Sequence, residues 1–248
     1  MGTTDARRVL LGQLIDHAPT FPPALLAPDA ALAEDERAVA SSSSFVLGRL
    51  VWRASGLGLL ASSRRPVSAV LDAPVPEGAA VEAVEATYRE DLDSLACLAP
   101  EVFVEVALAD GLEGRLDRLA GCGFRAKVRC GGEVVPDVAA LAEFVRACRE
   151  RRLPFKATAG LHHAVCTNGE HGFLNLLAAV TFEGDEEAVL SEQDASAFSL
   201  DAGAFAWRDR SATAAELERV RSETIRSIGS CSFFEPVEEL ELLGVLPL

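Results

Sequence analysis

Short apolar segments of strand length alternate along the chain with stretches in which apolar residues recur at helical spacing. This alternation predicts β-strand and α-helix units that build a parallel sheet. We expect strands at 11–17, 45–52, 67–72, 102–108, 124–129, 154–159 and 228–233. We expect helices at 28–40, 79–98, 111–121, 136–152, 172–182, 185–193, 211–226 and 235–243, and a hairpin at 198–207.

Seven or eight such units in 248 residues predict a (β/α)8 barrel of the TIM type, whose usual length is about 250 residues. We expect one barrel domain over residues 1–248 that is irregular around its seventh unit, because 176–182 fits either a strand or a helix. An open, doubly wound α/β sheet is the alternative architecture.

The two-residue period of a strand predicts which side chains face the barrel axis. In 124–129, apolar residues alternate with Lys127 and Arg129, which we therefore expect to point inward. The same reasoning directs Lys156 and Glu105 into the barrel. Near the ends of their strands, it also directs Asp16, Arg49 and Asp72 inward.

Charged side chains that converge inside a barrel need an explanation, because buried charge is costly unless it is paired. They either form a compensated structural network or line an active site at the mouth formed by the C-terminal strand ends, where barrel enzymes do their chemistry. We favour the active site.

Lysine is scarce in this chain: it occurs twice, against 21 arginines, and both lysines fall within predicted strands. A desolvated lysine can lose its proton and form an imine with a carbonyl compound, whereas arginine can do neither. Burial and a neighbouring cation both favour the neutral amine. The sequence thus suggests that Lys127 and Lys156 are retained for amine chemistry.

Lys156 begins the string Lys-Ala-Thr-Ala-Gly, which resembles the sixth strand of class I, Schiff-base aldolases of the deoxyribose-phosphate aldolase type. In that family an imine-forming lysine precedes small or hydroxylated residues and a glycine, and a second lysine comes from the following strand. The resemblance implies that Lys156 attacks a substrate carbonyl. The chain departs from the pattern at Ala159, where the family has threonine, and by placing Lys127 on the preceding predicted strand.

Longer strings, at 156–163, 172–175 and 229–232, are similar to a group of uncharacterised bacterial proteins, and that resemblance implies no activity.

The favoured hypothesis is a lyase, most simply an aldolase, in which Lys156 is the nucleophile and Lys127 lowers its pKa. Glu105, Asp16 or His162 would transfer protons. The substrate would be small and phosphorylated or carboxylated. Its candidate contacts are Arg129, Arg49, Asp72, His163, Asn175, Ser230 and Ser232.

Two alternatives keep the barrel. One is an isomerase or lyase that uses acid–base or metal-assisted chemistry, and the other is a non-catalytic ligand-binding barrel. We expect no cofactor and no bound metal, since the six cysteines show no zinc-ligand spacing.

Composition and sequence pattern narrow the classes of partner that the protein could bind and its cellular location. A net charge of −15 argues against binding to nucleic acid or to an anionic membrane surface. The N-terminal residues lack a signal-peptide pattern, and dispersed cysteines are typical of reduced thiols, so we expect a cytoplasmic protein. The sequence allows a homo-oligomer but does not decide the oligomeric state.

Overall fold

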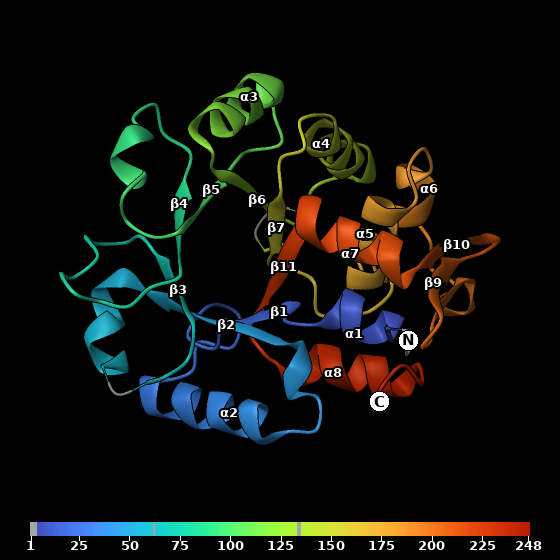
Figure 1. Cartoon of the computed structure of the whole chain (residues 1–248), viewed down its shortest axis with the longest axis horizontal. Helices are drawn as coiled ribbons and strands as arrows, with labels where there is room; N and C mark the ends of the chain where they lie inside the picture. Colours follow the sequence, from blue (N-terminus) through green and yellow to red (C-terminus); the bar gives the residue numbers. More distant parts are fainter. Residues whose placement is uncertain (1–3, 62, 133–134) are drawn as a thin grey trace.

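The fold is a closed barrel of eight parallel strands, and the computed structural model describes residues 4–61, 63–132 and 135–248. The strands follow one another around the barrel in chain order, and the last one hydrogen-bonds back to the first (Figure 1). The predicted (β/α)8 class is therefore confirmed. The barrel strands are β1 (Ile15–His17), β2 (Leu47–Arg53), β3 (Val67–Val70), β4 (Ala83–Thr87), β5 (Glu101–Glu105), β6 (Arg125–Arg129), β7 (Phe155–Thr158) and β11 (Ile225–Ser230).

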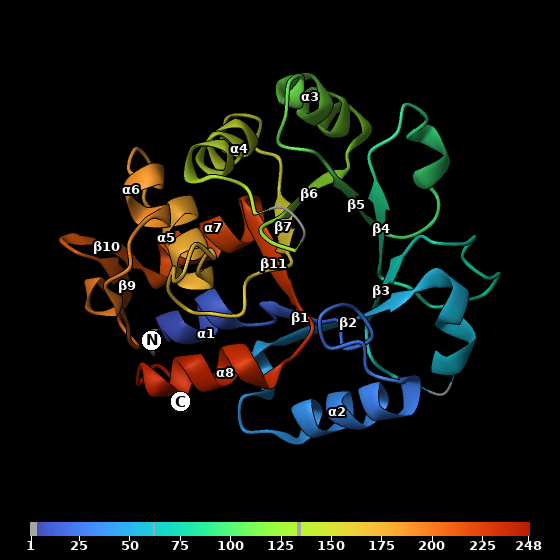
Figure 2. The same cartoon turned by 180° about the vertical axis from the view of Figure 1, so that it is seen from behind.

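Helices lie outside the barrel, and both views place the two chain ends close together near α1 and α8 (Figures 1 and 2). Between β2 and β5 the connections are loops and short 3₁₀ turns, so this side of the barrel carries no long helix within the described residues. The elements are α1 (Ala6–Leu11), α2 (Pro28–Ala40), η1 (Ser44–Val46), η2 (Ala54–Leu60), η3 (Asp93–Leu95), α3 (Leu112–Cys122), α4 (Val138–Glu150) and α8 (Phe234–Leu242).

The connection between β7 and β11 is the irregular seventh unit that the sequence predicted. The ambiguous segment 176–182 falls mainly within a helix, and the expected hairpin is part of a small antiparallel sheet outside the barrel. This connection comprises α5 (Phe173–Thr181), α6 (Glu186–Leu190), η4 (Ala195–Ala197), β8 (Phe198–Leu200), β9 (Ala204–Trp207), β10 (Arg210–Thr213) and α7 (Ala214–Glu223).

The helix expected at 79–98 is wrong, because this segment contains the barrel strand β4 followed by η3. Apolar residues at helical spacing and an abundance of alanine and glutamate favoured a helix. In the structure, β4 pairs with β3 on one side and β5 on the other and so closes the barrel. Tertiary pairing has overridden local propensity here.

The extra strand changes the position of every later strand in the barrel. The segment taken as the fifth strand is the sixth, and the segment that carries Lys156 is the seventh. The first strand also begins later than predicted, because residues 6–11 form α1, whose start is capped by the Asp5 carboxylate.

The predicted side-chain directions on β5, β6 and β7 are confirmed. Val104, Ala126, Val128 and Ala157 belong to the apolar core around the barrel, where the helices pack. The intervening charged residues turn toward the axis, where they meet charges from other strands. Strand alternation therefore brings charges from distant parts of the sequence together inside the barrel.

Candidate active site

Lys127 and Lys156 lie directly beside each other on neighbouring strands, because β6 and β7 pair with these two residues in register. Lys156 is fully buried, with 0% of its surface exposed, whereas Lys127 keeps 8%. The sequence-based expectation of two amines meeting in a water-poor interior is therefore confirmed.

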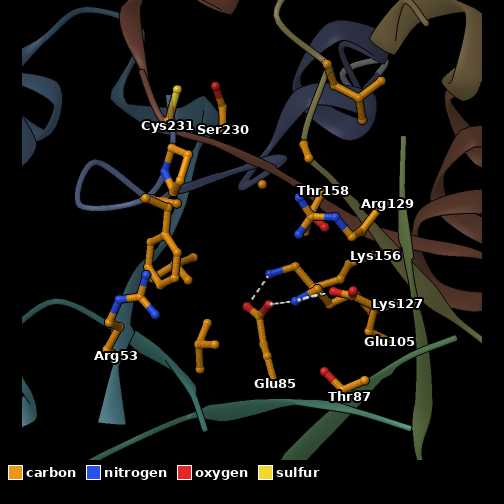
Figure 3. Close-up of a pocket in the computed structure, with 18 of the residues that line it drawn as sticks. Arg53, Glu85, Thr87, Glu105, Lys127, Arg129, Lys156, Thr158, Ser230 and Cys231 are labelled. Atoms are coloured by element: carbon orange, nitrogen blue, oxygen red, sulfur yellow. Dashed lines mark hydrogen bonds and ion pairs between the residues drawn. The ribbon is translucent and has the colours of Figure 1, made fainter. Parts of the chain in front are cut away.

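One carboxylate, that of Glu85 on β4, joins the two lysines (Figure 3). Its Oε1 lies 2.6 Å from Lys156 Nζ, and its Oε2 lies 3.0 Å from Lys127 Nζ. The Ser68 hydroxyl donates a further hydrogen bond of 2.8 Å to Oε1. Glu85 is thus the centre of the buried charge cluster, although the sequence interpretation had placed it on a helix.

Asp16 holds the other side of Lys156. Its Oδ2 lies 2.6 Å from Lys156 Nζ and accepts a 2.7 Å hydrogen bond from the Ser227 hydroxyl. The backbone amide of Arg49 donates to Oδ1 at 2.9 Å. Gly48 leaves room for this arrangement, since a Cβ at that position would lie 2.5 Å from Asp16 Oδ1.

Glu105 completes the cluster on the side nearer the solvent. Its Oε2 lies 3.1 Å from Lys127 Nζ, and its side chain is 22% exposed. Lys127 thus lies between a buried carboxylate, Glu85, and a more accessible one. Among the members of this cluster, Glu105 is the carboxylate best placed to exchange a proton with water or with a ligand in the cavity.

The expectation that the surroundings of Lys156 favour its neutral form is wrong. Burial alone would lower the pKa of Lys156, but the carboxylates of Asp16 and Glu85 outweigh it and raise that pKa above its ordinary value. Burial likewise opposes ionisation of Glu85, yet Lys156 and Lys127 hold the pKa of Glu85 well below its usual range. Both groups of this pair are therefore charged at neutral pH.

A cavity of about 370 Å³ opens above the cluster at the C-terminal ends of the strands. Lys127, Glu105 and Thr158 are among its polar lining, and Phe21, Pro22, Val51, Val70 and Leu71 contribute apolar surface. Figure 3 shows Arg53 and Arg129 on opposite sides of this space. The cavity therefore has charged side chains at its bottom, an apolar wall and an arginine on each of two sides. Its volume is within the range of small-molecule sites.

Just beyond the C-terminal ends of β6 and β7, the two chain segments come into close backbone contact. There the backbones of Gly131 and Gly160 touch, and a Cβ on Gly131 would lie 2.6 Å from the Gly160 Cα. Gly160 also has a positive φ of 69°, which disfavours any other residue. Both positions therefore require glycine.

Several predicted site residues do reach the cavity. Arg129, His162 and Ser230 line it together with the two lysines and Glu105, and Asp16 adjoins it through Lys156. The His162 Nδ1 lies 3.0 Å from Glu235 Oε2, which orients the imidazole at the rim. The Ser230 hydroxyl oxygen accepts a weak hydrogen bond from the Ser232 amide at 3.4 Å.

Other predicted site residues lie elsewhere. Arg49 projects toward the opposite end of the barrel, where it pairs with Glu82 and Glu101, so its assignment to the substrate site is wrong. Asp72 does not point into the barrel, because its carboxylate binds the backbone amide and the hydroxyl of Ser55.

The remaining three predicted contacts have local structural partners. Asn175 is fully buried, and its amide bonds to backbone groups of Cys166, Val189 and Glu192. His163 pairs with Glu239 on α8. The Ser232 hydroxyl oxygen accepts a hydrogen bond from the amide of Glu235 in the first turn of that helix.

Sequence reasoning missed Glu85 and Arg53. The signal for Glu85 was a short alternation in 83–87, in which the polar positions 85 and 87 flank the apolar Ala86. Arg53 is the last residue of β2, one position beyond the predicted strand.

Comparison of the chain with protein-family models gives no match, and comparison with curated proteins gives no significant relative. Within the described ranges, no group of three or more His, Cys, Asp or Glu side chains has an arrangement suited to a metal ion. None of the helices in the described part of the chain is long and apolar enough to cross a bilayer.

Proposed function

We propose that the barrel performs lysine-imine chemistry on a small anionic aldehyde or ketone, most simply as a carbon–carbon lyase of the aldolase type. The observation that carries this proposal is the position of Lys127, which borders the cavity between Glu85 and Glu105. We assign the nucleophile to Lys127 rather than Lys156, because Lys127 keeps some exposed surface and contacts the accessible carboxylate of Glu105, whereas Lys156 has no exposed surface and both of its carboxylate partners are buried.

In the proposed reaction, Lys127 first gives a proton to Glu105 and its Nζ then attacks the substrate carbonyl carbon. The carbinolamine loses its hydroxyl as water, with a proton returned by Glu105, and a protonated imine remains. Glu105 then takes the proton of the substrate's β-hydroxyl as the adjacent carbon–carbon bond breaks, and the electron pair of that bond passes into the iminium, which gives an enamine and a carbonyl product. Protonation of the enamine carbon and hydrolysis of the imine release the second product and restore the amine.

Lys156 has a supporting part in this scheme. As a permanent buried cation it keeps Glu85 ionised, and it places positive charge next to the attacking amine. The roles inferred from the sequence are therefore reversed. With β4 counted, Lys127 stands on the sixth barrel strand and Lys156 on the seventh. This is the strand order of the two lysines in the aldolase family that the sequence resembles, although the Lys-Ala-Thr-Ala-Gly string itself lies on the seventh strand.

Arg53 and Arg129 support an anionic substrate. Both line the cavity, and neither makes an ion pair with another residue of the described ranges. Arg53 stacks over the Phe21 ring at 4.8 Å, which orients its guanidinium at the rim. A carboxylate or phosphate held there would leave the carbonyl end of the substrate to reach toward Lys127.

Reductive trapping tests the proposal directly. Borohydride is added with a panel of small aldehydes, 2-oxo acids and sugar phosphates, and the adduct is located by intact mass and peptide mapping. With two lysines in the chain, the assignment is simple. We expect an adduct on Lys127 that is absent in Lys127→Arg and still formed in Arg53→Gln at a higher substrate concentration. If neither lysine carries an adduct with any compound of the panel, imine chemistry is rejected.

Acid–base isomerisation is the second candidate, and the accessible carboxylate of Glu105 favours it. In that case the substrate would exchange a carbon-bound proton with deuterated solvent without forming a borohydride-stable adduct, and Glu105→Gln would abolish the exchange.

A further inference from the structure

A second cavity, of about 220 Å³, lies at the opposite end of the barrel, where the strands begin. Arg49 of β2, Arg226 of β11 and Arg221 of α7 contribute to its lining, together with Glu82. Three arginines thus come together around one small space in a chain whose net charge is −15. The lysine chemistry proposed above does not use this end of the barrel.

The arginines at this end outnumber their carboxylate partners. Arg49, Arg125 and Arg226 all share the single carboxylate of Glu101, at distances of 2.8, 2.9 and 3.0 Å. Glu82 adds one further contact, at 3.3 Å from Arg49 Nε. Asp16 also borders the cavity, and its carboxylate is ion-paired with Lys156, which it shares with Glu85.

Arg221 has no carboxylate partner among the described residues. Its guanidinium donates to the backbone carbonyls of Gly12 and Ile225, at 3.0 and 3.2 Å. Burial and then the neighbouring Arg226 lower the pKa of Arg221 to about 10, so it remains charged at neutral pH. Four guanidinium groups therefore face the carboxylates of Glu82 and Glu101 and the already paired carboxylate of Asp16, so positive charge exceeds negative charge at this end of the barrel.

We propose that this cavity, termed here the floor site and formed by Arg49, Arg221 and Arg226, binds a small oxyanion of the phosphate or carboxylate class. Guanidinium groups match the oxygens of such anions through paired, charge-assisted hydrogen bonds. The anion would supply the charge that Glu82 and Glu101 leave unmatched. The floor site is separated from the lysine cavity by the Asp16–Lys156 pair and does not depend on the proposed reaction.

Inorganic phosphate is the probe, with calorimetric titration and thermal unfolding measured against sodium chloride at equal ionic strength. We expect saturable binding and a concentration-dependent rise in Tm. Arg221→Gln should weaken binding about tenfold, since it removes a charge-assisted contact. The matched control is Arg118→Gln, at an exposed arginine of α3, which should bind phosphate as the original chain does. Arg129→Gln shows separately whether any phosphate is held at the mouth.

Glu82→Gln provides a second test that does not depend on the folding of Arg221→Gln. Its side chain is 58% exposed, so the substitution is tolerated, and it removes a carboxylate that competes for Arg49. We expect tighter phosphate binding in this variant. The proposal is overturned if the original chain shows no saturable binding, if Glu82→Gln binds phosphate less tightly, or if only Arg129→Gln loses it, which would place the anion at the mouth.

Discussion

Glu85→Gln is the substitution that most sharply tests the buried cluster. It keeps the shape of the side chain and a hydrogen-bond acceptor but removes the charge that Lys156 and Lys127 share. After the change, Lys156 keeps one carboxylate, Asp16, and Lys127 keeps only Glu105. We expect a clear loss of stability, because two ammonium groups then remain in the interior with half of their carboxylate contacts.

The magnitude follows from the burial of the group. Glu85 is 2% exposed, and breaking a buried ion pair from one side costs about 3–5 kcal/mol. The retained amide oxygen places the expected cost near the lower end, at about 3 kcal/mol. For a chain of this size, that corresponds to a fall in Tm of about 6–12 °C. Urea unfolding followed by circular dichroism gives the free energy, and an unchanged slope shows that the same folded state is being compared.

Glu105→Gln is the matched control for this experiment. It makes the same chemical change in a side chain that is 22% exposed and contacts one lysine, so we expect a cost of about 1 kcal/mol or less. The cluster contains three carboxylates, of Asp16, Glu85 and Glu105, and two ammonium groups. A Glu85→Gln variant as stable as Glu105→Gln would mean that net charge, not the local contacts, controls stability, and the reasoning would be refuted.

Three further predictions concern the pH dependence of Glu85, the reactivity of the cysteines and the buried amide of Asn175. Because the folded-state pKa of Glu85 is depressed, its contribution to stability is present above about pH 4.3, the pKa of an unfolded glutamate, and is lost as the pH falls further. The free energies of unfolding of the original chain and of Glu85→Gln should therefore converge when both are measured at increasingly acid pH. Burial raises the pKa of the Cys130 thiol to about 12, so a thiol reagent should modify exposed Cys97 first and Cys130 only on unfolding. Asn175→Ala should cost about 2–4 kcal/mol in urea unfolding, since three buried backbone contacts lose their partner, whereas exposed Ser222→Ala should cost little.

The barrel class and the direction of the central side chains could be predicted from the sequence. Strand alternation fixes which side chains face inward, so Lys127, Lys156 and Glu105 were placed by that rule alone. The irregular connection after β7 was likewise visible as a loss of regular rhythm.

What the sequence could not provide was the partner of each charge. Glu85 lies in a segment whose composition favours a helix, and the strand forms because β3 and β5 both need a neighbour there. The sequence contains no information on which carboxylate meets Lys156, so the direction of its pKa shift was inferred wrongly. Arg49 was misplaced for a related reason: alternation gives the face of a strand but not the depth along the barrel.

The contact between Gly131 and Gly160 has a consequence for how the amine pair is spaced. The two chain segments leave the barrel pressed together without side chains between them, so a single methyl group at either position would push the ends of β6 and β7 apart. Alanine substitutions there would change the separation of the two amines while leaving every ionisable group in place. The separation of the two lysine amines can therefore be changed by substituting an uncharged residue outside the cluster.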